Sequence, residues 1–119
     1  MLMYSTYQFI KIFFSFALLA LPFRYVQANS EDQKAFAVAK QNACLGCHAI
    51  NKKIVGPSFE AVAKKYQADS NAQVFLKNKI AKGGAGSWGV VPMPANAKLS
   101  DADLSLLTAW ILRGAPNKN

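Results

Sequence analysis

The 119-residue chain is poor in residues that bind metal ions or form cross-links, with one histidine, His48, and two cysteines, Cys44 and Cys47. A disulfide between cysteines three positions apart would close too short a loop to stabilise the fold appreciably. A structural zinc site needs four ligands of the Cys or His type, and the chain offers three. A thioredoxin-type redox pair requires a strand followed by a helix, and no strand pattern precedes Cys44.

Acidic residues are also few. The chain has six of them and fourteen lysines and arginines, which gives a formal net charge of +8. The basic residues are scattered and no nucleic-acid-recognition motif is present, so we do not expect binding to nucleic acid. Long apolar runs are missing as well. Residues 12–21 form the longest, about half the ~20 residues that span a bilayer, so no stable membrane insertion is expected.

The first 28 residues have the order of a secretory signal peptide. The apolar run 12–21 follows a polar segment, and small residues end at Ala28, where a signal peptidase would cut. We therefore expect cleavage after Ala28 and a periplasmic domain of residues 29–119. Arg24 is unusual so close to a cleavage site, and it leaves an uncleaved membrane anchor as the alternative.

The mature domain is small and moderately basic. Without Lys11 and Arg24, it has twelve basic residues and all six acidic residues of the chain, which gives a formal net charge of +6. A domain of this size buries only a modest share of its surface and is often marginally stable alone. With disulfides excluded, a buried cofactor is the better candidate for completing its core.

Four helices and no strands are expected, which predicts an all-α fold. The first helix should open at the capping box 30–33 and run to about Asn42. A second capping box, 70–73, should open the third helix, which Gly83 should end.

The other two helices have single serine N-caps. Ser58 precedes an apolar face of the helical period, formed by Phe59, Val62, Ala63 and Tyr66. Ser100 precedes the last helix, which Gly114 and Pro116 should end. The apolar stripe of this last helix consists of Leu104, Leu106, Leu107, Trp110 and Ile111.

The segment Cys44-Leu45-Gly46-Cys47-His48 is the attachment signature for haem of the c type. Two thiols three positions apart on a helical turn can both reach the vinyl edge of one porphyrin. The adjacent His48 is then carried under the iron as its fifth ligand. We expect one covalent haem c per chain.

The inventory of possible sixth ligands is short. His48 is the only histidine, and Met1 and Met3 would leave with the signal peptide, so Met93 is the only thioether of the mature chain. A lone methionine is commonly core filler. However, Met93 stands between Pro92 and Pro94 in the glycine-rich loop 83–99, and two fixed φ angles present a side chain rigidly. We expect Met93 to bind the iron, which raises the reduction potential.

These motifs resemble those of the short bacterial class I cytochromes c, over nearly the whole mature chain. The resemblance rests on Cys44-x-x-Cys47-His48, on Gly56-Pro57, and on Trp88-Gly89-x-x-Pro92-Met93-Pro94-x-Asn96. The 45-residue step from His48 to Met93 suits that compact group. The resemblance implies a class I cytochrome c fold of about four helices around one haem.

The resemblance also implies roles for four residues beyond the iron ligands and the attachment cysteines. Pro57 should accept a hydrogen bond from His48 Nδ1. Trp88 and Lys79 should approach the haem propionates, and Asn96 should place its amide near the Met93 sulfur. A solvated helix lysine and an ordinary turn residue are the plain alternatives for Lys79 and Asn96.

The family further implies that Trp110 contacts the first helix. The chain departs from the family pattern at two places in that region. Ala39 stands where some relatives have an aromatic residue, with Phe36 one turn earlier, and Ala43 stands where glycine is frequent.

An iron with both axial positions filled can change charge but does not readily bind substrate. We therefore expect a non-enzymatic, one-electron carrier in the periplasm, working between respiratory-chain donors and a terminal reductase or oxidase. It should be monomeric and meet redox partners transiently, and Lys52 and Lys53 could steer it to acidic surfaces. The alternatives are a haem-bearing subunit of a larger redox enzyme, or a haem enzyme or gas binder if Met93 is not a ligand.

Overall fold

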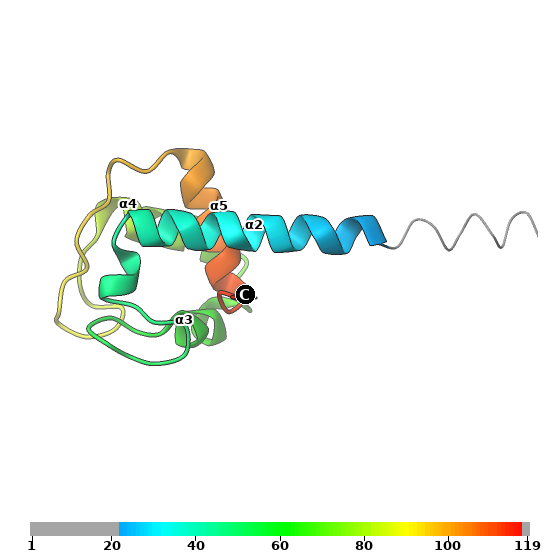
Figure 1. The fold of residues 1–119 in the computed structure, drawn as a ribbon. Helices are drawn as coiled ribbons and strands as arrows, with labels where there is room; N and C mark the ends of the chain where they lie inside the picture. Colours follow the sequence, from blue (N-terminus) through cyan, green and yellow to red (C-terminus); the bar gives the residue numbers. More distant parts are fainter. Residues whose placement is uncertain (1–21, 118–119) are drawn as a thin grey trace, which may run out of the picture. The chain divides into compact units, whose positions relative to one another are not determined.

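The computed structural model describes the backbone of residues 22–117 and the side chains of residues 30–117. The chain divides into two units, Met1–Ser30 and Glu31–Asn119. The helices are α2 (Pro22–Gln41), α3 (Phe59–Tyr66), α4 (Ala72–Lys82) and α5 (Asp101–Leu112), with a short 3-10 helix, η1, at Cys44–Gly46 (Figure 1). Residues 22–117 contain no strand beyond two isolated bridges, so the all-α prediction is confirmed.

Helix α2 begins earlier than the sequence predicts. It starts at Pro22, so the expected N-cap Ser30 lies inside the helix, and it ends at Gln41. Extending an existing helix costs less than nucleating one, so preceding residues override a capping signal. Of the expected signal peptide, residues 1–21 lie outside the described part and residues 22–28 form the start of α2. No helix of the described part is long and apolar enough to cross a membrane.

Helix α3 follows its prediction closely. The side chain of Ser58 accepts a hydrogen bond from the backbone N–H of Ala61 at 3.1 Å, which is the geometry of an N-cap. Phe59, Val62 and Ala63 are buried, as their helical spacing predicts. This face of α3 packs against α5.

Helix α4 starts differently from its prediction. Ser70 is not the N-cap; Asn71 holds that position, without a side-chain hydrogen bond to the helix. The carboxylate of Asp69 accepts a hydrogen bond from the Asn71 N–H at 2.8 Å, and this local turn competes with the capping box. The helix ends as predicted at Gly83, whose φ of 69° is easily adopted only by glycine.

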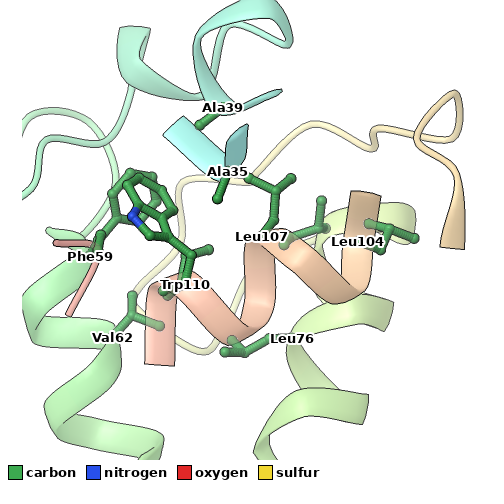
Figure 2. Close-up of a cluster of buried hydrophobic side chains, with 11 residues drawn as sticks. Ala35, Ala39, Phe59, Val62, Leu76, Leu104, Leu107 and Trp110 are labelled. Atoms are coloured by element: carbon green, nitrogen blue, oxygen red, sulfur yellow. The ribbon is translucent and has the colours of Figure 1, made fainter. Parts of the chain in front are cut away.

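Helix α5 lies at the centre of the core. Ser100 caps it by accepting from the Asp103 N–H at 3.1 Å, as predicted. Gly114 follows its C-terminus with a φ of 85°. Figure 2 shows side chains of all four helices meeting in one cluster, among them Ala35 and Ala39 of α2, Phe59 and Val62 of α3, Leu76 of α4, and Leu104, Leu107 and Trp110 of α5.

Trp110 makes the aromatic contact with the first helix that the family resemblance implies. Its fully buried ring lies edge-on to Phe36 of α2, with centroids 6.3 Å apart, and to Phe59 of α3 at 5.2 Å. Ala39 is fully buried, and Phe36, one turn earlier, supplies the aromatic ring. An ion pair of 2.6 Å between Asp32 and Arg113 also joins α2 to α5. These contacts fix α2 and α3 against α5.

Candidate haem site

The two cysteines and the histidine share one tight turn. Cys44 begins η1, and its carbonyl accepts hydrogen bonds from the N–H groups of Cys47 at 3.2 Å and His48 at 3.0 Å. The two cysteines are not joined by a disulfide, and both are half-buried. Burial raises the pKa of the Cys44 thiol, a backbone hydrogen bond lowers it, and nearby Cys47 raises it further. Cys44, Cys47 and His48 therefore line one cavity from a single turn of the chain.

Ala43, which leads into this turn, has left-handed backbone geometry, with φ 57° and ψ 18°. An L-residue pays a steric cost there that glycine avoids. We expect Ala43→Gly to stabilise the protein by about 0.5–1 kcal/mol, measured by guanidinium unfolding. The control is Ala37→Gly at an exposed site within α2, where the same change should destabilise by a similar amount. If both variants changed the free energy of unfolding in the same direction, the prediction would be wrong.

His48 is held by a hydrogen bond and by a ring contact. Its Nδ1 lies 2.7 Å from the carbonyl oxygen of Pro57. Because a carbonyl can only accept, Nδ1 carries the proton, which makes Nε2 the ring nitrogen that can bind a metal ion. Phe59 stacks on the imidazole, with ring centroids 5.4 Å apart and an interplanar angle of 17°. The ring is therefore fixed with the nitrogen that a metal needs available.

Gly56 leaves the space that the imidazole occupies. A Cβ at this position would lie 2.3 Å from His48 Cε1 and 2.7 Å from Nδ1. We expect Gly56→Ala to displace the ring, weaken its hydrogen bond to Pro57 and destabilise the protein by about 1–3 kcal/mol. Guanidinium unfolding measures the loss. Gly46→Ala is the matched control, because its added Cβ meets nothing within 4 Å. Similar stabilities for the two variants would be inconsistent with this packing.

Met93 is presented by a loop whose ends are fixed to each other. The backbone groups of Gly84 and Met93 bond reciprocally, at 2.9 and 3.1 Å. The Asn96 N–H donates to the carbonyl of Ile80 in α4 at 2.9 Å. A Cβ on Gly83 would lie 2.4 Å from the Met93 carbonyl oxygen, so the chain passes close to itself there. Met93 is half-buried and packs against the core.

A cavity of about 700 Å³ brings these groups together. Every site residue predicted from the sequence lines it, namely Cys44, Cys47, His48, Pro57, Lys79, Trp88, Met93 and Asn96. Its volume is that of a cofactor pocket. Two thiols, one imidazole and one thioether among apolar walls are a donor set that fits haem c and fits no structural zinc site.

Two neighbours of the site were not predicted. Phe59 looked like one member of the apolar face of α3, and nothing in its spacing indicates a stack on His48. The ammonium of Lys65 lies 4.5 Å from the centre of the Trp88 ring and donates to the Ser87 carbonyl at 2.7 Å. Lys65 and Ser87 are 22 positions apart, so no local sequence pattern predicts their contact.

Known proteins are similar to this chain in sequence and fold. Residues 33–115 match the family model described as Cytochrome c. Cytochrome c-552 of Nitrosomonas europaea is 41% identical over 88 residues, covering 74% of this chain and 80% of that protein. Cytochrome c-551 of Allochromatium vinosum is 45% identical over 75 residues, covering 63% of this chain and 80% of that protein.

A solved structure agrees with this likeness. The crystal structure of wild-type Nitrosomonas europaea cytochrome c552 matches with a TM-score of 0.63 and 42% identity, covering 66% of this chain and 96% of that one. The four helices, the one cavity that all the predicted site residues line, and the family match point to one conclusion. The chain belongs to the cytochrome c family as a short monohaem class I member, a small electron carrier with one covalently attached haem c.

Proposed function

We propose that this protein carries single electrons in the periplasm, with its haem iron held between His48 and Met93, from respiratory-chain donors to a terminal reductase or oxidase. The observation that carries the proposal is that the one histidine and the one methionine of residues 29–119 line the same cavity as Cys44 and Cys47. The bound haem supplies an iron that gains or loses one electron.

The surrounding protein groups keep the two ligands in place. The Pro57 carbonyl accepts from His48 Nδ1, which fixes the ring and raises the basicity of Nε2. The backbone pair between Gly84 and Met93 limits how far the thioether can move. Because both ligands are held, oxidation and reduction require little rearrangement.

Three further residues complete the proposed site. Trp88 and Lys79 donate to the haem propionates from the glycine-rich loop and from α4, and Asn96 directs its amide to the Met93 sulfur. The support is that all three line the cavity, that Lys79 is half-buried, and that Asn96 follows Met93 by three positions.

Carbon monoxide binding tests the carrier against a haem enzyme or gas binder. With both axial positions filled, the ferrous protein should show no rapid change of its visible spectrum on addition of carbon monoxide at neutral pH. The ferric protein should show the absorption band characteristic of methionine bonded to iron. A high-spin ferrous form that binds carbon monoxide readily would refute the proposal.

Export depends on the N-terminal segment. The proposed signal peptide, residues 1–28, is removed after Ala28, which leaves residues 29–119 as a monomer in the periplasm. Its support is the order of charge, apolar run and small residues in the sequence. The N-terminus of the periplasmic protein should be Asn29, and its size-exclusion volume should be that of a monomer.

Lysines beside the site are proposed to steer transient partners. Lys52 and Lys53 are exposed and follow the attachment motif closely, and Lys53 lines the cavity. We expect reaction with an acidic redox partner to slow about tenfold from low to high ionic strength, because screening removes the attraction. The measurement is stopped-flow mixing at several salt concentrations. A rate indifferent to salt would rule out steering.

A further inference from the structure

We propose that Lys65 is a positioning residue for Met93, because it fastens the tip of the glycine-rich loop, residues 85–92, to helix α3. The inference rests on the proposed function, in which Met93 binds the iron. It assigns to a helix lysine outside the cavity lining a role in keeping the sixth ligand in place.

Lys65 is exposed, and its ammonium contacts three groups. Its Nζ donates to the carbonyl of Ser87 at 2.7 Å. The same atom lies 4.5 Å from the centre of the Trp88 ring and 5.3 Å from that of Tyr66. Both distances are within the range of cation–π attraction. A single charge thus contacts two rings and one carbonyl, and two of these three groups belong to the loop tip.

Apart from its side facing the proposed haem, where it lines the cavity, the loop tip has few attachments to the rest of the chain. Its internal hydrogen bond runs from the Gly86 N–H to the Gly89 carbonyl at 2.8 Å. Within residues 30–117, the bond from Lys65 is the one hydrogen bond described between this tip and a helix. Val90, the one residue of the tip that does not line the cavity, is 91% accessible. Segments with so few buried contacts open at low free-energy cost.

Movement of the tip would be passed on to the ligand. Gly86 and Gly89 have φ of 98° and 113°, so the tip contains two backbone positions with wide conformational freedom. Pro92, the last residue of the tip, is bonded directly to Met93. Because the φ of Pro92 is fixed, a displacement of the tip also moves Met93. Holding Ser87 and Trp88 against α3 therefore limits the excursions that would carry the thioether away from the iron.

Cyanide binding to the ferric holoprotein measures this effect, since cyanide can bind only after Met93 has left. We expect Lys65→Ala to bind cyanide about tenfold faster than the wild type, equivalent to about 1.4 kcal/mol. Lys65→Arg keeps a cation and a donor and should return the rate to near the wild-type value. Lys64→Ala is the matched control, because Lys64 is an exposed neighbour in the same last turn of α3.

The outcomes are distinguishable. Equal cyanide rates for Lys65→Ala and Lys64→Ala, or a Lys65→Arg rate as fast as that of Lys65→Ala, would overturn the inference. So would a Lys65→Ala protein that loses stability to guanidinium but keeps the wild-type cyanide rate, because that is a purely structural role. A wild-type ferric spectrum without the methionine–iron band would overturn the proposed function, and this inference with it.

Discussion

A double variant with Cys44→Ala and Cys47→Ala, purified without haem, is expected to be largely unfolded at 25 °C. The cavity that the cofactor would fill has a volume of about 700 Å³ and is lined from α2, α3, α4, α5 and the segments between them. Of the thirteen buried hydrophobic residues described, five are alanines, which contribute little apolar area. Without the cofactor, the remaining core is too small to offset the conformational entropy of the chain.

Far-ultraviolet circular dichroism during heating measures this loss. The haem-containing wild type should show strong helical signal and one cooperative transition, and the haem-free double variant should show weak signal and no such transition. The single variant Cys44→Ala is the control, because it retains one thiol and His48 for attachment and should keep most of its helicity when haem is bound. A cooperative, native-like helical fold in the haem-free double variant would contradict the prediction.

Replacement of Met93 by alanine should change the redox chemistry more than any other single substitution in the loop. The thioether raises the potential of a histidine-ligated haem, so its loss should lower the potential by an amount on the order of 0.2 V. The ferrous variant should also become high-spin and bind carbon monoxide, because one axial position is then open. Potentiometric titration and visible spectra measure both changes.

Leu99→Ala is the matched control for Met93→Ala. Leu99 is another half-buried side chain of the same loop that packs against the core. Its truncation should cost stability through the lost apolar contact, with little change in potential and no carbon monoxide binding. A Met93→Ala protein that retained the wild-type potential would show that Met93 is not the ligand and that it serves only as core packing.

The sequence predicted the parts of the fold that depend on local signals. Ser58 and Ser100 are N-caps because each is followed by an apolar helical face that docks on a neighbouring helix. The capping boxes beginning at Ser30 and Ser70 were misleading for local reasons of their own. Residues before Ser30 extend α2 through it, and the Asp69 carboxylate forms a competing turn ahead of α4.

The site was predictable where one chemical requirement fixes a spacing. Two thiols and an imidazole must lie on one turn, and a thioether between two prolines is presented rigidly, so the residue types and their spacing suffice to predict a site from Cys44, Cys47, His48 and Met93. The structure places all four residues around one cavity. The supporting contacts were not predictable. The stacking of Phe59 on His48 and the hydrogen bond from Lys65 to Ser87 depend on how α3 packs against distant loops. Contacts between residues far apart in the sequence produce no periodic pattern in it.

A redox titration of the purified protein, followed by visible spectra, tests the central claim that a His48- and Met93-ligated iron carries single electrons. We expect a reversible one-electron transition, a low-spin haem c spectrum throughout, and the methionine–iron band in the fully oxidised form. A spectrum that lacks this band, together with a high-spin reduced form, would show that the iron is not held between His48 and Met93.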